Sequence, residues 1–105
     1  MPQVLVYVTA GSRDEAVKIG RAAVESRLAA CANVLPAPTT SIYWWQGKLE
    51  QAEEVSLILK TRAALVDELV AKVKAQHSYD CPCVVALPIE GGNPQFLEWI
   101  DAETA

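Results

Sequence analysis

Two cysteines and one histidine lie close together in the sequence and are the residues best suited to chemistry. Cys81 and Cys83 flank Pro82, and His77 lies four residues before Cys81. Residues two apart on a strand point to the same side, so the two thiols could converge. Thiolates and imidazole are soft or borderline ligands that suit Cu(I) and Zn(II). We therefore consider His77, Cys81 and Cys83 as ligands of a copper or zinc ion.

The same three residues also have a purely structural interpretation. Their spacing differs from that of a structural zinc site, which usually joins two separated pairs of ligands. Free cysteines are often buried, which favours Cys83 as a small apolar residue at the start of a strand. Cys81 would then be a loop thiol, and His77 a polar residue at a helix end, where the helix dipole favours it.

A run of three aromatic residues, Tyr43, Trp44 and Trp45, is the second candidate for function. Side chains alternate between the two faces of a strand, so at least one tryptophan must face away from its own core. A cross-strand aromatic pair would explain only one face. Because aromatic residues are enriched at interface cores, we expect Trp44 and Trp45 at a subunit interface or beside a small-molecule cleft.

The elements that position these residues begin with an apolar, β-branched segment at residues 3–9, which predicts a central strand. Ser12 followed by Glu15 is a capping box, in which each side chain can bond the other's backbone N–H. An apolar stripe at helical spacing then predicts a helix from Arg13 to about Ala30.

A long hairpin is predicted next. Residues 31–45 have strand character, but Pro36 and Pro38 interrupt it because proline cannot donate to a ladder. The turn follows at Gln46-Gly47-Lys48, with Gly47 free to take a positive φ, and the partner strand covers residues 49–61.

The remaining chain predicts a second helix from about Leu65 and a buried strand at residues 84–87. Asn93 and Pro94 then start a last helix, as its cap and its first residue. The order β-α-β-β-α-β with a C-terminal helix is the ferredoxin-like pattern of the α+β class. We expect a four-stranded antiparallel sheet with two helices on one face, and exposed sheet edges that are used in an oligomer.

Composition narrows the class of protein. The 105 residues indicate a single domain over residues 1–105, and 51% hydrophobic against 21% charged residues excludes a disordered chain. The net charge is −4 and no basic cluster exists, so no nucleic-acid partner is expected. No basic n-region precedes the first apolar segment, and prolines break the longest uncharged window. We therefore expect no membrane partner and a cytoplasmic location, where thiols stay reduced.

Several motifs resemble those of the CutA divalent-cation tolerance family. The match is carried by Leu28–Asn33, Ser41–Glu50, Glu53–Val55, Leu59–Thr61, His77–Pro82, Ala86–Ile89, Gly92–Asn93 and Phe96–Ile100. The aromatic hairpin and the His-x-Tyr-x-x-Pro segment are specific in combination, and the matches run in family order over nearly the whole chain.

The resemblance implies a homotrimer of ferredoxin-like subunits, a role in tolerance of divalent metals with copper the usual assignment, and a cytoplasmic location. It brings no catalytic reaction and no required cofactor, apart from copper or another divalent metal ion. Cys31 becomes a candidate metal contact, with a packed core thiol as the alternative. Relatives usually carry proline and glutamate where this chain has Ser78 and Cys83, so the role of that carboxylate is in doubt here, and a thiol could strengthen soft-metal binding.

Three functions compete on these grounds. The first is a non-enzymatic trimer in copper or divalent-metal homeostasis that binds metal weakly. The second is a signalling module similar to the PII proteins, with a small anion or metabolite bound in intersubunit clefts by Tyr43, Glu54, Lys60 and Tyr79. The third, a small enzyme such as an acylphosphatase, lacks the phosphate-cradling loop with its arginine and is ranked last. The single histidine, with no motif placing a serine and an aspartate beside it, also makes a catalytic triad not credible.

Overall fold

The first strand, β1 (Gln3–Ala10), lies inside the sheet in the computed structural model, which describes residues 2–105. β4 (Lys48–Arg62) pairs with one edge of β1 and β5 (Val84–Pro88) with the other, both antiparallel. Val4, Val6 and Val8 are buried and the residues between them are half-buried. The two faces of this strand therefore differ, since only one of them is covered by helices.

Five strands form the sheet rather than the four predicted. The predicted strand region 31–45 is divided into β2 (Cys31–Val34) and β3 (Thr39–Trp45), both of which pair antiparallel with β4. The break falls at Pro36 and Pro38, which lack the N–H that a ladder needs. The order is β2-β4-β1-β5, with β3 beside the outer part of β4. The α+β class and the ferredoxin-like arrangement are confirmed.

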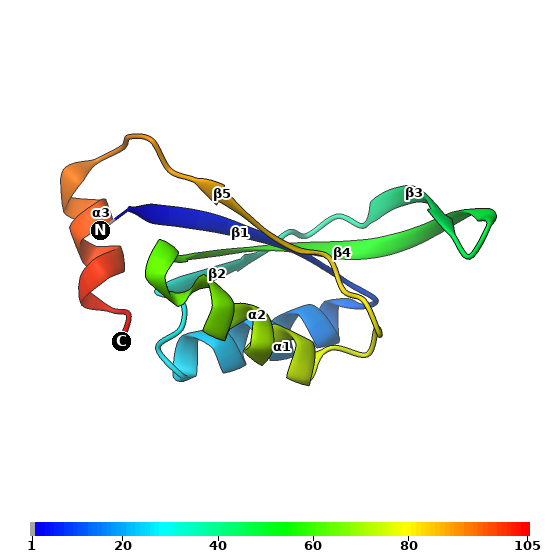
Figure 1. Ribbon diagram of the computed structural model, residues 1–105, viewed down its shortest axis with the longest axis horizontal. Coiled ribbons are helices and arrows are strands. Elements are labelled where there is room, and N and C mark those ends of the chain that lie inside the picture. Colours follow the sequence, from blue (N-terminus) through cyan, green and yellow to red (C-terminus); the bar gives the residue numbers. More distant parts are fainter. Residues whose placement is uncertain (1) are drawn as a thin grey trace.

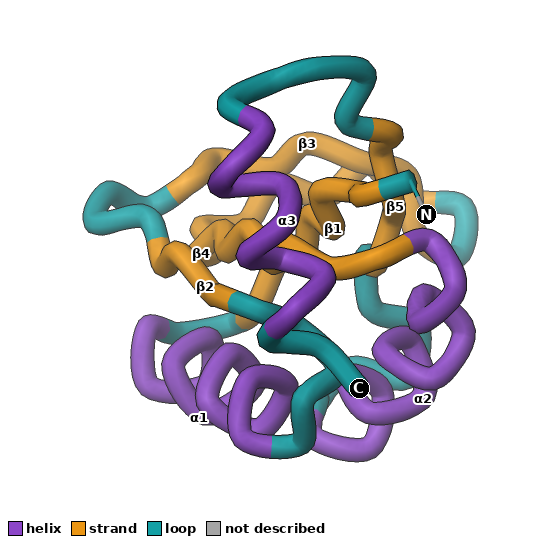
Figure 2. The backbone as a smooth tube through the Cα atoms, turned by 90° about the vertical axis from the view of Figure 1, so that its left-hand side faces the viewer, coloured by secondary structure: helices purple, strands orange, loops and turns teal. Residues whose placement is uncertain are grey.

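Two helices cover one face of the sheet, as predicted. They are α1 (Arg13–Glu25) and α2 (Val66–Gln76), the latter preceded by the short 3₁₀ turn η1 (Ala63–Leu65), and they lie together below the sheet in Figures 1 and 2. The largest fully buried side chains fill the space between them and the sheet: Ile19, Leu57, Leu59, Leu69, Val6, Val8 and Val73. Among residues 2–105, no helix covers most of the opposite face of the sheet (Figures 1 and 2).

The last helix, α3 (Pro94–Ala102), lies across one end of the sheet (Figure 2). The Asn93 side chain accepts a hydrogen bond from the Gln95 N–H at 3.1 Å, and Pro94 is the first helical residue, as predicted. Ile100 is fully buried and anchors the helix. Among residues 2–105, no helix combines the length and the apolar character needed to span a membrane.

Helix α1 ends at Glu25, five residues before the predicted end near Ala30. The Ser26 hydroxyl donates to the Ala22 carbonyl at 2.8 Å, and Arg27 adopts a φ of 63°. A serine that bonds back to the helix carbonyls, followed by a left-handed residue, terminates a helix. Residues 28–30 are buried nevertheless, so their apolar character was mistaken for helical periodicity.

The hairpin of β3 and β4 projects beyond the rest of the molecule (Figure 1). Its turn places Gln46 at φ 50° and Gly47 at φ 80°, so Gly47 takes the positive φ that was predicted. β1 pairs with β4 only from Val55 onward, whereas residues 48–54 of β4 pair with β3 alone among the described strands. We call residues 39–54 the arm, a two-stranded ribbon with neither face covered by a helix.

Candidate functional site

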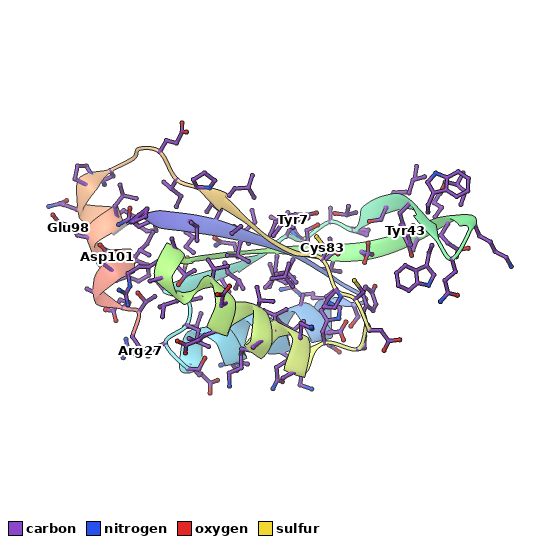
Figure 3. The ribbon with its side chains drawn as sticks, in the orientation of Figure 1. Tyr7, Arg27, Tyr43, Cys83, Glu98 and Asp101 are labelled. Carbon is purple, nitrogen blue, oxygen red and sulfur yellow. The ribbon has the colours of Figure 1, made fainter. Side chains whose placement is uncertain are left out.

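A cavity of about 650 Å³ lies where the arm joins the sheet, and we call it the arm pocket. Strands β1, β3 and β4 and the loop between α2 and β5 all contribute to its wall. The lining residues are Tyr7, Thr9, Ser41, Ile42, Tyr43, Trp45, Glu54, Tyr79, Asp80, Cys81 and Cys83. Figure 3 shows three of them, with Tyr7 and Cys83 near the base of the arm and Tyr43 further out on it.

Strand alternation brings the arm residues to the pocket. Thr39 lies opposite Glu54 in the β3–β4 register, so Ser41, Tyr43 and Trp45 share the face of Glu54. Trp44 points to the other face and is 72% exposed. The two tryptophans thus occupy opposite faces, and neither reaches the core of its own subunit.

The buried hydroxyl of Ser56 links three strands beside the pocket. The Ser56 hydroxyl is hydrogen-bonded to the Tyr7 hydroxyl at 2.7 Å and to the Thr39 hydroxyl at 2.8 Å. Ser56 is almost completely buried, so its polar atom needs these partners. The bonds connect β1, β3 and β4 at the point where the arm leaves the sheet.

The central polar pair of the pocket is Glu54 and Tyr79. Glu54 is only 8% exposed, and its Oε2 accepts a hydrogen bond from the Tyr79 hydroxyl at 3.0 Å. Burial, and then the hydrogen bond to the Glu54 carboxylate and its charge, raise the pKa of Tyr79 to about 12. Tyr79 therefore keeps its proton at neutral pH and acts as a donor.

His77 holds the loop that forms the far wall. Its Nε2 lies 2.7 Å from the Thr9 carbonyl oxygen, and its Nδ1 accepts the Tyr79 N–H at 3.1 Å. A carbonyl can only accept, so Nε2 carries the proton and the ring is neutral in this arrangement. Both ring nitrogens are occupied, and His77 positions Tyr79 instead of presenting a free nitrogen to a metal ion.

Glu15 ties the same loop to the start of α1. As the capping box predicts, the Ser12 hydroxyl accepts the Glu15 N–H at 3.1 Å. The Glu15 carboxylate, however, accepts the N–H of Gly11 at 2.9 Å and that of Ser78 at 2.8 Å, not that of Ser12. Partial burial acts to raise the pKa of Glu15, but the hydrogen bonds from Ser78 and Gly11 outweigh it and lower the pKa.

The two thiols of the loop are accessible. Cys81 and Cys83 are both exposed and both line the arm pocket, so the interpretation of Cys83 as a buried apolar residue is wrong for the single chain. The strand β5 begins after Cys83, which leaves this thiol on the loop. Partial desolvation, and then the charge of Glu54, raise the pKa of Cys83, while a hydrogen bond with Thr9 opposes them.

A metal site within one chain is not formed. Across residues 2–105, no three His, Cys, Asp or Glu side chains come close enough together to hold an ion. His77, Cys81 and Cys83 lie near one another along the chain, but the nitrogens of His77 are turned to Thr9 and Tyr79. A metal site that joins thiols from several subunits stays a prediction.

Among the predicted site residues, Lys60 and Cys31 lie away from the pocket, as does Trp44 on the other face of the arm. Lys60 is on the same face of β4 as Glu54 but six residues further, about 20 Å along a strand. Its Nζ lies 3.5 Å from the Cys31 sulfur, donates to Asn33 Oδ1 at 2.5 Å, and lies 5.8 Å from the Phe96 ring centre. Cys31 is half-exposed on β2 and is not a core thiol. The structure therefore brings together Tyr43, Glu54 and Tyr79 without Lys60.

Sequence reasoning missed several residues around the pocket. Tyr7 carried a usable signal, because it is a hydroxyl-bearing residue within the apolar run of β1. Glu15 was assigned only to the helix cap, since nothing in its spacing indicates the second bond to Ser78. The position of Asp80 in the pocket could not be predicted from the sequence, because an irregular loop has no periodic pattern.

Comparison with known proteins identifies the family. A family model described as "CutA1 divalent ion tolerance protein" matches residues 4–103. The chain belongs to the CutA1 family. The divalent-cation tolerance protein CutA of Archaeoglobus fulgidus is 47% identical over 96 residues, which cover 91% of this chain and 92% of that protein. The corresponding protein of Thermus thermophilus is 43% identical over 100 residues, or 95% of this chain and 96% of that protein.

CutA1 relatives of plants are longer. The chloroplastic CutA 1 protein of Oryza sativa is 43% identical over 104 residues, which cover 99% of this chain and 58% of the rice protein. The chain thus spans little more than half of that relative. The crystal structure of the rice protein superposes with a TM-score of 0.95 and covers all of this chain and 95% of the crystallised one.

Proposed function

We propose that the protein acts in divalent-cation tolerance as a non-enzymatic homotrimer that binds metal ions weakly, copper among them. Membership of the CutA1 family supports the general role, because the names of the Archaeoglobus and Thermus relatives state it. The observation that carries metal binding is the pair of exposed thiols, Cys81 and Cys83, on the wall of the arm pocket. Two soft donors separated by a single residue suit Cu(I) or Zn(II).

Assembly would supply the ligands that one chain lacks. Two thiols are too few for zinc, which takes four ligands in structural sites. Three copies of the chain would present each thiol three times, so neighbouring subunits could complete a site. Free thiols stay reduced in the cytoplasm, so we include a cytoplasmic location in the proposal.

Exposed apolar side chains on the arm and on β5 support the proposed trimer. Ile42, Trp44 and Leu49 on the arm are each more than 60% exposed, and Val85 and Leu87 on the outer strand β5 are about half exposed. An edge strand with apolar side chains tends to pair with another chain. Burying this surface between subunits would remove the cost of leaving it in water.

The metal-binding part is tested by titrating Cu(I) against a competing chelator. We expect the double variant Cys81→Ser, Cys83→Ser to bind Cu(I) at least about tenfold more weakly, because both soft donors are removed. Cys31→Ser is the matched control, since Cys31 is a half-exposed thiol outside the pocket, and its affinity should equal that of the original protein. Unchanged affinity in the double variant would exclude a local thiol site.

The arm pocket supports a second candidate function, a PII-like module that binds a small metabolite in clefts between subunits. Its volume of about 650 Å³ lies within the range of small-molecule sites. Its wall combines aromatic rings with a few polar groups, which is the usual make-up of such sites. The titrations described below test this candidate directly.

A further inference from the structure

The charged side chains that line the arm pocket are all negative. Its lining includes the carboxylates of Glu54 and Asp80 and no Lys, Arg or His. Within residues 2–105, the Glu54 side chain has one hydrogen-bond partner, the Tyr79 hydroxyl on Oε2, and no ion-pair partner. A carboxylate that is 8% exposed and bonded at one oxygen lacks the compensation that buried charges usually have. A positive ligand would supply it.

Aromatic rings line the same pocket as this carboxylate. The Tyr79 hydroxyl bonds to Glu54, whereas Trp45 lies opposite Lys48, at the far end of the arm. Tyr7, Tyr43, Trp45 and Tyr79 all line the pocket. The face of an aromatic ring is electron-rich and attracts ammonium groups, most strongly when the site is shielded from water. A carboxylate among several rings is therefore suited to an organic cation, with the rings against its alkyl groups.

A bare metal ion suits the same pocket less well. Hard divalent cations need several oxygen ligands around them, and no three carboxylate, thiol or imidazole groups converge among residues 2–105. An alkylated ammonium ion needs no such ligand shell. Within the described residues of one chain, anions are disfavoured too, because Lys60, the cation predicted for the cleft, lies about 20 Å along β4 from Glu54.

We propose that the arm pocket binds an organic ammonium ion, with its charged nitrogen beside Glu54 and its carbon groups against Tyr43 and Tyr79. The proposal rests on the second proposed function, small-molecule binding in this pocket, and replaces the small anion expected from the sequence with a cation. It does not depend on the thiol metal site.

The test is calorimetric titration of the assembled protein with matched probes. Choline is compared with 3,3-dimethylbutan-1-ol, its neutral isostere, and 1,4-diaminobutane with 1,4-butanediol. We expect at least one ammonium probe to bind roughly tenfold or more tightly than its neutral partner, the ratio that cation–π contact and a carboxylate together provide. The two pairs distinguish a quaternary from a primary ammonium ligand.

Two matched pairs of variants locate the binding. Glu54→Gln keeps an acceptor for Tyr79 but removes the charge, and we expect roughly tenfold weaker binding. Glu53→Gln makes the same change on the opposite face of β4, where the side chain is exposed, and should leave binding unchanged. Likewise Tyr43→Leu should weaken binding and Trp44→Leu should not, since only Tyr43 lines the pocket.

The outcomes separate the two proposals. Equal binding of an ammonium probe and its neutral isostere, or equal losses in the Glu54 and Glu53 variants, would overturn the cation proposal. If ATP or another anion binds and Tyr43→Leu abolishes that binding while no ammonium probe binds, the pocket remains a metabolite site and the cation proposal fails. If none of the probes or anions binds, both proposals fail.

Discussion

Glu15 joins two parts of the molecule through a single carboxylate. One oxygen accepts the Gly11 N–H at the start of α1 and the other accepts the Ser78 N–H on the pocket loop. Hydrogen bonds to a charged acceptor are stronger than neutral ones, but Glu15 is half-exposed, so solvent reduces their value. The loop that carries Tyr79 and the thiols is thus anchored at its beginning by Glu15 and His77.

The first prediction concerns this carboxylate and pH. Glu15→Gln should lower the free energy of unfolding by about 1 kcal/mol at neutral pH, because a neutral acceptor replaces a charged one. The folded protein lowers the pKa of Glu15 below 4.5, so its contribution is complete above that value and is lost as the pH falls through the lower folded value. Guanidinium unfolding at fixed protein concentration measures the difference.

The control for this prediction is Glu25→Gln on the same helix. Glu25 is exposed and its Arg21 partner lies 4.0 Å away, so its removal should cost little at any pH. An equal loss of stability in both variants, or a Glu15 effect that persists in acid, would contradict the anchoring role.

Residue-level prediction of the site succeeded where strands carry the side chains. Tyr43 and Glu54 reach the same pocket because alternation along β3 and β4 sets their faces. The same alternation sets Lys60 on that face too, but six residues separate it from Glu54, so it lies about 20 Å along the same strand, as the sequence spacing already indicates. The ring nitrogens of His77 are engaged by backbone groups of other segments, which no local pattern indicates.

At the scale of elements, the arm depends on its turn. Gly47 has a φ of 80°, a conformation that costs other residues about 1–2 kcal/mol. We predict that Gly47→Ala lowers the free energy of unfolding by about 1 kcal/mol, or melts the arm locally, as seen by hydrogen exchange of its amides.

Gly91 offers the matched control for that substitution. An added Cβ would meet no atom within 4 Å at either glycine, but Gly91 does not have a positive φ. Gly91→Ala should therefore leave stability almost unchanged. If the two alanine variants behave alike, the turn conformation is not what stabilises the hairpin.

Much of the element order could be predicted because local rules and the fold agree. The Ser12 cap, the Asn93–Pro94 helix start and the Gly47 turn each follow from the chemistry of one or two residues. The end of α1 was placed too late because Leu28, Ala29 and Ala30 are buried in a loop, and burial alone does not distinguish a loop from a helix. β2 and β3 are separate strands because Pro36 and Pro38, which lie between them, lack the N–H that a ladder needs.

At the scale of the whole molecule, the proposed trimer gives the next prediction. Light scattering at micromolar concentration should give three times the mass of one chain. Trp44→Asp should yield smaller particles, because Trp44 is 72% exposed and a charge there would oppose burial between subunits. Lys18→Asp on the exposed side of α1 is the control and should stay trimeric. A monomer for the unmodified protein would contradict the assembly.

The arm also implies that stability varies along a single strand. In β4, residues from Val55 onward pair with β1 and lie above the helices, whereas residues 48–54 belong to a ribbon with one neighbour. Two-stranded ribbons are marginally stable in water without further contacts. In one isolated chain, amide protection should therefore fall sharply between Val55 and Glu54. The boundary coincides with the carboxylate of the arm pocket, so a ligand bound there would slow exchange on the arm side and leave the core amides unchanged.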